Sequence, residues 1–375
     1  MRAASHRPVV IAAGGTGGHF FPAEALAAEL IARGERVVLL TDARSSAVNS
    51  PVFQRCETHV IPGAGIAGRS VARAAAGAAA IARGVLAARP ILKRLGPACV
   101  IGFGGYPSVA PLLAARSLRH RPLLVLHDQN AVLGQANALL ARLCDKIALS
   151  FADTAGVPAG RVAVHTGNPV RPAIVAQAGA PYAPSPAQKI DVLVLGGSLG
   201  ARVFGALIPA ALAQLPEALR ARIRLTMQCP APVLAEAQAA LVACGVQAEL
   251  SPFFGDVAGL LTRVHLVIGR AGGSTCAELT VIGRPAVLIP LQINADQHAN
   301  AQALVAAGAA VLVRQTDGPE ALGQALKALL QDPARMQAMA RAAAKMGIRD
   351  AAGRLADLVA PADHGAAVSA DGVKA

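Results

Sequence analysis

Apolar runs alternate with amphipathic stretches along most of this chain. The first unit and the strand after it comprise "RPVVIAA" (7–13), the glycine-rich "GGTGGH" (14–19), the helix-like "PAEALAAELIARG" (22–34) and "RVVLLTD" (36–42). Pro22 suits the first turn of a helix and Gly34 suits its C-terminal cap. The pattern predicts strand–loop–helix units that build a parallel sheet.

The same plan recurs in the second half of the chain. A strand-like run, a glycine loop and a helix-like stretch follow one another in "DVLVL" (191–195), "GGSLGAR" (196–202) and "FGALIPAALAQL" (204–215). Each half has a further glycine loop after a strand, "CVIGFGGYPS" (99–108) and "HLVIGRAGGST" (265–275). Each half then has a strand with a polar end, "PLLVLHDQN" (122–130) and "PAVLIPLQINADQHAN" (285–300). We therefore predict an α/β protein of two doubly wound, Rossmann-like domains that face each other across a cleft.

Composition shifts suggest where these domains begin and end. We expect an N-terminal domain over 1–170 and a second domain over 190–343, joined by the Pro- and Ala-rich segment 171–189. The helix-like stretch 344–360 could pack on either domain, and we expect it on the N-terminal one. Residues 361–375 lack periodicity and are expected to be mobile.

Cysteine usage and charge narrow the class of protein. The six cysteines show no C-x-x-C spacing, the first apolar run is too short for a signal peptide, and no apolar run approaches the length of a membrane span. These features favour a globular protein of a reducing, cytosolic compartment. The formal net charge is +13, and residues 58–127 hold nine Lys or Arg and no Asp or Glu. This block is either a solvated basic face or a surface for a polyanion, and the 3% aromatic content argues against nucleic acid.

The glycine loops predict a site for an anionic ligand, because helix N-termini after parallel strands offer free N–H groups. A dinucleotide is one alternative, with Asp42 as the ribose-binding acid, but its fingerprint would place Phe20 at the third glycine. In "GRAGGSTCAEL", residues 272–275 can donate hydrogen bonds to a diphosphate. One turn later, Glu278 can accept hydrogen bonds from ribose hydroxyls, or it can be a surface glutamate favoured by the helix dipole.

Seven motifs in a fixed order carry a resemblance to a known family. The motifs "GGTGGH", "GFGGYPS", "HDQN", "GNPVR", "GGSLGAR", "RAGGSTCAEL" and "DQHANA" lie within residues 14–301. Together they resemble those of the bacterial peptidoglycan N-acetylglucosaminyltransferases of glycosyltransferase family 28, the MurG family. The resemblance implies the GT-B fold and inverting transfer of GlcNAc from UDP-GlcNAc to the muramyl C4 hydroxyl of lipid I, which makes lipid II. It also implies no cofactor, no nucleic acid, a place on the cytoplasmic face of the inner membrane and contacts with other cell-wall synthesis proteins.

The resemblance assigns residues to both substrates. The predicted substrate-binding residues are Thr16, Gly17, Gly18, Tyr106, Asn130, Arg171, Ser198, Phe254, Gly273, Ser274, Thr275, Glu278, Asp296 and Gln297. Among them, Thr16, Gly17 and Gly18 should border the donor sugar and the diphosphate of lipid I, and Ser198 the donor phosphates. Asn130 and Arg171 should contact the donor. Phe254 should pack against the uracil, and Glu278 should bind the ribose. Asp296 and Gln297 should bind the GlcNAc hydroxyls. Asn130 could instead cap a helix, and Arg171 could be a linker charge.

Two positions depart from the family pattern. Asp128 stands where the family usually has glutamate, which puts a direct role of this shorter carboxylate in doubt. Leu199 stands where glutamine is common, so one polar contact is missing.

The transfer needs a base for the hydroxyl that attacks. His19 is the first candidate because histidine as a residue type titrates near neutral pH, and His127 and Asp128 are its rivals. His19 could instead bind the diphosphate of lipid I. Helix N-termini at 196–200 and 272–275 can stabilise the departing UDP without a metal.

The basic block gains a purpose if one substrate hangs on a lipid. Residues 66–96 mix apolar side chains with Arg69, Arg73, Arg83, Arg89, Lys93 and Arg94. This mixture suits peripheral docking on an anionic membrane, and the alternative is a merely basic pair of helices. Two other functions stay open: a nucleotide-sugar epimerase and a non-catalytic UDP-sugar-binding subunit.

Overall fold

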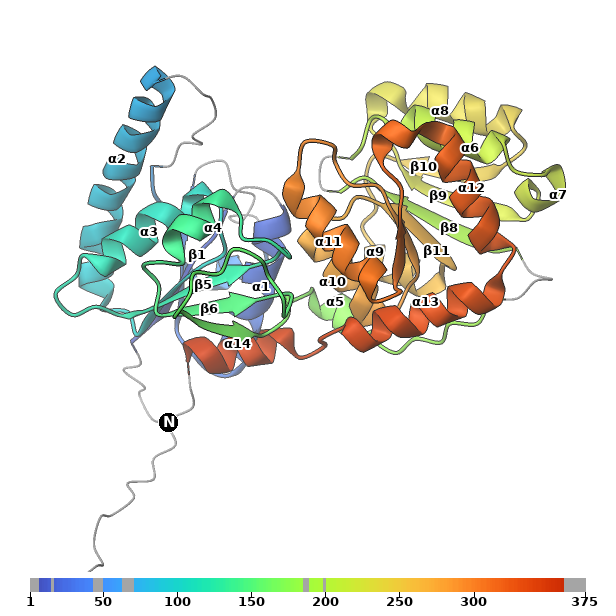
Figure 1. Ribbon diagram of the computed structural model, residues 1–375. Coiled ribbons are helices and arrows are strands. Elements are labelled where there is room, and N and C mark those ends of the chain that lie inside the picture. Colours follow the sequence, from blue (N-terminus) through green and yellow to red (C-terminus); the bar gives the residue numbers. More distant parts are fainter. Residues whose placement is uncertain are drawn as a thin grey trace, which may run out of the picture.

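Two parallel sheets form the frame of the molecule. The computed structural model describes residues 7–14, 17–42, 50–62, 71–184, 189–197 and 200–360. The N-terminal sheet has seven strands in the order β3-β2-β1-β4-β5-β6-β7 and the C-terminal sheet has six in the order β10-β9-β8-β11-β12-β13. Figure 1 shows the two sheets, each with helices on both faces, side by side. The predicted pair of doubly wound α/β domains is confirmed.

The N-terminal domain contains the first seven strands. They are β1 (Val9–Ala12), β2 (Val37–Thr41), β3 (Glu57–Val60), β4 (Cys99–Gly102), β5 (Leu123–Asp128), β6 (Lys146–Leu149) and β7 (Val162–His165). Its helices are α1 (Gly17–Ala32), the 3-10 turn η2 (Phe53–Arg55), α2 (Val71–Leu95), α3 (Tyr106–Arg116) and α4 (Gln135–Leu140). The central strands β1 and β4 are apolar throughout because helices cover both faces, whereas the edge strands β3 and β7 are largely exposed.

The C-terminal domain contains the other six strands. They are β8 (Ile190–Leu195), β9 (Ile223–Gln228), β10 (Gln247–Ser251), β11 (Leu266–Gly269), β12 (Ala286–Leu288) and β13 (Ala310–Leu312). Its helices are α5 (Pro172–Val175), α6 (Phe204–Ala213), α7 (Glu217–Arg220), α8 (Ala231–Ala243), α9 (Val257–Arg263), α10 (Gly273–Ile282), α11 (Ala295–Ala306), η3 (Gln315–Asp317), α12 (Gly318–Leu330) and α13 (Pro333–Met346).

The chain passes between the domains twice, at neighbouring points. The first crossing follows β7 and the second follows α13, and a Cβ on Gly167 would lie 2.8 Å from the Cβ of Ile348. After the second crossing, α14 (Ala351–Val359) packs on α1, and Leu355 and Val359 join the N-terminal core. Figure 1 shows α14 beneath the N-terminal domain, apart from α13. The stretch 344–360 is therefore two helical pieces with a crossing between them.

The segment after the first crossing lies against the C-terminal domain. Ile174 is fully buried in that domain's core, and the Tyr182 hydroxyl donates a 2.7 Å hydrogen bond to the His265 carbonyl. The guanidinium of the buried Arg284 contacts the Tyr182 ring at 5.2 Å. Within 171–189, residues 185–188 lie outside the described residues, as do 361–375.

Candidate active site between the two domains

Helix α1 begins in the first glycine loop, earlier than the sequence indicated. It starts at Gly17, so Pro22 lies inside the helix and the placement of Pro22 in the first turn was wrong. Proline has no N–H, so the carbonyl four residues earlier, that of Gly18, has no intrahelical donor. Ser274 of the opposite domain supplies one, with its Oγ 3.3 Å from the Gly18 oxygen. The predicted neighbour Thr16 lies outside the described residues.

The predicted base, His19, is half-buried on the first turn of α1, and its ring is hydrogen-bonded to Gln129. Its Nδ1 lies 2.9 Å from Gln129 Oε1, and Gln129 Nε2 lies 2.9 Å from His127 Nδ1. His127 Nε2 in turn lies 3.2 Å from the Gly167 carbonyl oxygen. Burial lowers the pKa of His127 to about 4. Because His127 is fully buried and both its ring nitrogens are engaged, the geometry argues against the direct role in catalysis that the sequence allowed.

The second rival, Asp128, organises the loop after β5. Its carboxylate accepts hydrogen bonds from Asn130 N at 2.8 Å, Gly134 N at 3.3 Å and Asn137 Nδ2 at 2.7 Å. Burial raises the pKa of Asp128, and these three donors partly offset the rise. A carboxylate that is 1% exposed and so fully engaged is suited to shaping the loop rather than to taking a proton from a substrate.

The opposite wall of the site is the N-terminus of α10. Gly272 precedes the helix with no side-chain cap, so no capping side chain occupies the first N–H groups, those of Gly273, Ser274 and Thr275, as an anion site requires. Gly273 also lies directly against the other domain. A Cβ on it would stand 2.3 Å from the carbonyl oxygen of Gln129. The two walls therefore touch at this point.

Arg171 and Glu278 form an ion pair at the first crossing. Arg171 Nη2 lies 2.8 Å and Nε 3.1 Å from Glu278 Oε1, and the guanidinium lies 4.9 Å from the ring centroid of Phe21 on α1. Burial raises the pKa of Glu278, and the Arg171 charge partly offsets the rise. Arg171 thus ties α10 to α1 and is more than a linker charge. Glu278 is 8% exposed, so it is not a surface glutamate.

Helix α11 brings a third set of polar groups to the same region. Asn294 caps the helix by accepting from the backbone N–H groups of Asp296 and Gln297. Burial raises the pKa of Asp296, and His19 across the cleft opposes this rise. Gln297 Oε1 accepts from Leu291 N at 2.9 Å. The charges of Asp296 and His19 therefore act on each other across the cleft, while the side-chain oxygen of Gln297 holds the preceding loop.

Asn300, one turn after Asp296, bridges the two domains. Its Oδ1 accepts from Ala131 N at 2.8 Å, and its Nδ2 donates to Ala271 O at 2.9 Å and to Asn130 Oδ1 at 3.0 Å. Asn130, the predicted donor contact, therefore presents its oxygen to Asn300. The side chain of Asn300 is completely buried. Together with the Ser274–Gly18 contact, this bridge joins the described parts of the two domains.

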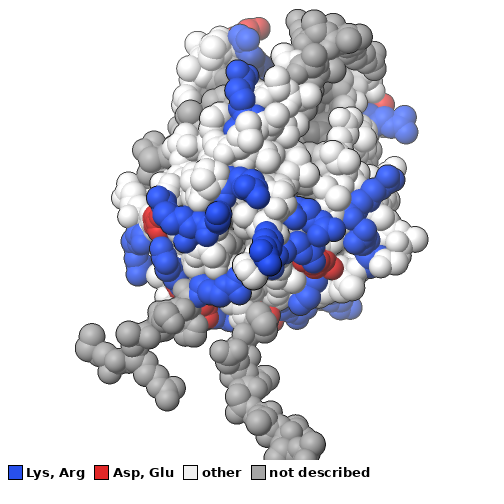
Figure 2. Space-filling view, turned by 90° about the vertical axis from the view of Figure 1, so that its left-hand side faces the viewer, with Lys and Arg blue, Asp and Glu red and all other residues white. Residues whose placement is uncertain are grey.

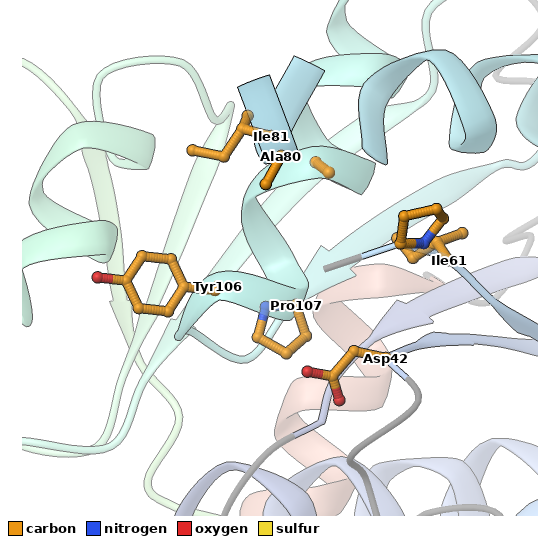
Figure 3. A pocket seen from close by; sticks show the side chains of 8 residues that line it. Asp42, Ile61, Ala80, Ile81, Tyr106 and Pro107 are labelled. Carbon is orange, nitrogen blue, oxygen red and sulfur yellow. The ribbon is translucent and has the colours of Figure 1, made fainter. Parts of the chain in front are cut away.

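Other predicted residues lie nearby or beyond the described chain. Phe254 is half-buried, whereas its neighbour Phe253 is 76% exposed. Ser198 lies outside the described residues. Tyr106 begins α3 and borders a small hollow that also takes in Asp42, Ile61, Ala80, Ile81 and Pro107. Figure 3 shows these side chains around the hollow, between the end of β2 and helices α2 and α3.

The basic block forms part of the outer face of the N-terminal domain. Arg83, Arg89, Lys93 and Arg94 on α2 are exposed, and Leu86 beside them is 71% exposed. Arg69 and the side chain of Arg73 lie outside the described residues. Figure 2 shows that positive side chains far outnumber negative ones on this face. Among the described helices, none is long and apolar enough to cross a membrane.

Comparison with known proteins identifies the family. The model of the glycosyltransferase family 28 N-terminal domain matches residues 9–149, and that of the C-terminal domain matches 191–355. A UDP-N-acetylglucosamine–N-acetylmuramyl-(pentapeptide) pyrophosphoryl-undecaprenol N-acetylglucosamine transferase of Acidiphilium cryptum is 57% identical over 96% of this chain and 98% of its own length. The chain belongs to glycosyltransferase family 28, in its MurG group. A protein of the same name from Granulibacter bethesdensis is 52% identical, over 95% of this chain and 94% of its own.

Solved structures agree with this membership. The crystal structure of Acinetobacter baumannii MurG superposes with a TM-score of 0.77 at 28% identity, over 94% of this chain and 99% of that one. The GT-B arrangement implied by the resemblance is therefore confirmed for this family 28 member. A putative UDP-N-acetylglucosamine 2-epimerase from Listeria monocytogenes has a TM-score of 0.68 at 17% identity, over 94% of this chain and 95% of that one, and shows the fold alone.

Two residues of the site were missed from the sequence. Gln129 alternates with His127 along the extended chain, so both point to the same side, and this period-two relation could have linked them. Asn300 follows Asp296 by four residues, so both share one face of α11. The bond between Asn300 and Asn130 spans 170 residues, and local patterns do not reveal such a pairing.

Proposed function

We propose that this family 28 enzyme transfers GlcNAc from UDP-GlcNAc to the muramyl C4 hydroxyl of lipid I and forms lipid II. The observation that carries the proposal is the meeting of His19 on α1 with the uncapped N-terminus of α10, joined by the Ser274–Gly18 contact. One wall offers a group that takes up a proton, and the other offers N–H groups for a diphosphate. The names of the relatives from Acidiphilium cryptum and Granulibacter bethesdensis support the same reaction.

In the proposed step, the C4 hydroxyl oxygen attacks the anomeric carbon of GlcNAc from the face opposite UDP. The new C–O bond forms as the bond from the anomeric carbon to the UDP oxygen breaks, and the configuration inverts. The hydroxyl proton passes to His19 Nε2, while the electron pair of the broken bond leaves with UDP. The N–H groups of Gly273, Ser274 and Thr275 stabilise the diphosphate charge.

The donor and the lipid-linked substrate occupy different domains in this proposal. Glu278, held by Arg171, accepts hydrogen bonds from the ribose hydroxyls, and Asp296 with Gln297 faces the GlcNAc hydroxyls. Phe254, or the more exposed Phe253, packs against the uracil. The diphosphate and muramyl part of lipid I lie near the start of α1 and the hollow beside Tyr106.

The outer face of the N-terminal domain is proposed to dock on the cytoplasmic leaflet of an anionic membrane. Exposed cations and the exposed Leu86 share helix α2, and Ala80 and Ile81 of the same helix border the hollow in Figure 3. Replacing Arg83, Arg89, Lys93 and Arg94 by Gln should weaken binding to anionic vesicles by up to ~1 kcal/mol per charge. Binding that persists unchanged at low salt would assign docking to another surface.

One incubation distinguishes the proposed reaction from its alternatives. The protein is mixed with UDP-GlcNAc and a short-chain lipid I analogue, and the products are separated by chromatography and mass spectrometry. Transfer yields UDP and a β-linked disaccharide on the analogue. An epimerase would yield an isomerised sugar without the analogue, and a binding subunit would leave both substrates unchanged. Either of these two results would overturn the proposed activity.

A further inference from the structure

The hydrogen bonds that link His19, Gln129 and His127 have defined donors and acceptors, because two backbone carbonyls at Gly167 and Phe103 can only accept. The Gly167 carbonyl only accepts, so His127 must carry its proton on Nε2, 3.2 Å away. His127 is neutral at physiological pH because burial depresses its pKa, and its Nδ1 is then a bare lone pair. That lone pair needs a donor, and Gln129 Nε2 is 2.9 Å from it.

The orientation of the Gln129 amide follows from its other partner. Gln129 Nε2 also donates to the Phe103 carbonyl at 2.9 Å, so a flipped amide would set its oxygen against a carbonyl and a lone pair. Oε1 therefore faces His19 Nδ1 at 2.9 Å and can only accept from it. The neutral imidazole of His19 then carries its proton on Nδ1, and Nε2 is its bare nitrogen.

The imidazole ring of His19 is also bounded by backbone. A Cβ on Gly104 would lie 3.3 Å from His19 Cε1, and one on Gly105 would lie 3.5 Å from Cδ2. Both glycines have positive φ, so the turn after β4 can follow the edge of the ring closely. The ring is thus held in its plane by the turn, and its two nitrogens are distinguished by Gln129.

We propose that Gln129 is the positioning residue that holds His19 in the Nδ1–H tautomer, so that Nε2 can receive the proton of the attacking hydroxyl. The inference rests on the proposed role of His19 as base. An uncharged amide fixes the tautomer without adding a negative charge beside the imidazole, which a carboxylate at this position would do. This series of hydrogen bonds ends at the carbonyl of Gly167, at the first domain crossing, where Gly167 packs against Ile348. The network therefore joins the base to the point about which the domains are connected.

The tautomer can be observed directly by ¹⁵N NMR of protein labelled at its histidines. The ring signals of His19 are assigned by their loss in His19→Gln. We expect the neutral form of His19 in the wild type to show a protonated Nδ1 and an unprotonated Nε2. The opposite tautomer in the wild type would overturn the proposal, and this measurement does not depend on whether any variant of Gln129 folds.

Kinetics of two variants supply the second test. Gln129→Met keeps the length of the side chain but removes both hydrogen-bonding groups, and kcat should fall by about 10- to 100-fold, with the affinity for UDP-GlcNAc retained. Gln129→Glu keeps an oxygen for His19 Nδ1 but sets its second oxygen against the Phe103 carbonyl and His127 Nδ1, so kcat should also fall below that of the wild type. Its acidic limb should move to higher pH because the added negative charge makes the imidazole more basic. Gln337→Met on the exposed face of α13 is the matched control and should behave as wild type.

The other charged and titratable groups near His19 are the same in all these variants. In the part of the chain that the structure describes, they are His127 and Asp128 of β5 and Asp296 of α11. Unchanged kcat and an unchanged pH profile in Gln129→Met would overturn the positioning role. If His19→Ala itself keeps normal kcat, the role of His19 as base fails, while the NMR measurement still decides whether Gln129 sets the tautomer.

Discussion

The two glycine loops that face each other across the cleft share one plan but place different chemistry on their helices. Both follow a buried parallel strand and lead into a helix whose N-terminus points into the cleft. The first turn of α1 contains an imidazole that is hydrogen-bonded to a buried amide. The first turn of α10 contains Gly273, Ser274 and Thr275 and no titratable group before Cys276 and Glu278. In the proposed reaction, proton transfer is thus assigned to one wall and anion binding to the other.

The two domains also differ in their net charge. Residues 1–170 contain 18 Lys or Arg and 8 Asp or Glu, whereas residues 190–343 contain 11 and 10. Between these two domains, the excess of positive over negative residues therefore lies almost entirely in the N-terminal domain, which we propose docks on the membrane. A duplicated fold allows such division, because each copy can change its loops and surface without disturbing the sheet.

The sharpest way to break this comparison is to remove the imidazole. His19→Ala should lower kcat by about 10²- to 10⁴-fold, since a positioned base contributes on that scale. The affinity for UDP-GlcNAc, measured by calorimetry, should change little, because the donor is assigned to the other wall. The acidic limb of the pH–rate profile on a soluble lipid I analogue should disappear.

The exposed His120 provides the control, and His120→Ala should retain the activity on a soluble substrate. A His19→Ala enzyme with near-normal kcat and a normal pH profile would remove His19 from proton transfer. A raised KM for the lipid I analogue with the acidic limb intact would instead assign His19 to binding the diphosphate.

The second test concerns the contact between the walls. Gly273→Ala places a Cβ 2.3 Å from the Gln129 carbonyl oxygen, and a backbone atom yields less readily than a side chain. Overpacking of this kind costs about 1–3 kcal/mol, which is about a 5- to 150-fold loss in kcat/KM if closure is required. Gly272→Ala is the comparator, since its Cβ would meet nothing nearer than 4.0 Å. Equal losses in the two variants would show that contact with Gln129 does not limit activity.

The sequence predicted the strands and glycine loops well because these are local patterns. Apolar runs such as 9–12 and 192–194 are buried on both faces and need no distant partner to be recognised. The first turn of α1 was misplaced because glycine usually breaks helices, whereas here Gly17 and Gly18 begin one and leave a carbonyl for Ser274.

The site was predicted less completely, and the reason is distance along the chain. The pairing of Arg171 with Glu278 spans 107 residues, and that of His19 with Gln129 spans 110. The family resemblance assigned the first pair and His19 to the substrates but did not show which side chains contact each other. The burial of His127, which argues against a direct role as base, depends on the packing around β5 and cannot be read from "HDQN".

A smaller effect is expected at the ion pair that joins the walls. Arg171→Met removes the partner of a buried carboxylate, so the free energy of unfolding at pH 7 should fall by about 1–2 kcal/mol. This loss is smaller than that for a fully buried pair because Arg171 is partly exposed. The loss should depend on pH. A carboxyl whose folded pKa is raised favours the folded state less as pH rises from the ordinary carboxyl pKa through the raised value.

Without Arg171 the pKa of Glu278 rises further, so the variant should approach wild-type stability near about pH 4 and lose most above it. Denaturant unfolding between acid and neutral pH measures this. The double variant Arg171→Met/Glu278→Gln should lose less stability and show little of the pH dependence. A loss of equal size at every pH in Arg171→Met would mean that packing on Phe21, rather than charge, accounts for the effect.

The smallest effect concerns the outer faces. Leu86 is 71% exposed on α2, and burying such a side chain in a membrane interface contributes about 1 kcal/mol, so Leu86→Ala should weaken vesicle binding about fivefold. Val242→Ala on α8 removes a similarly exposed apolar side chain from the C-terminal domain and should have no effect. Salt sharpens the comparison, because screening weakens the contribution of Arg83 but not that of Leu86. In sedimentation with anionic vesicles, the loss caused by Arg83→Gln should therefore shrink as salt rises, while the loss caused by Leu86→Ala persists. An equal loss of vesicle binding in Leu86→Ala and Val242→Ala would show that the two domains do not differ in membrane contact at these positions.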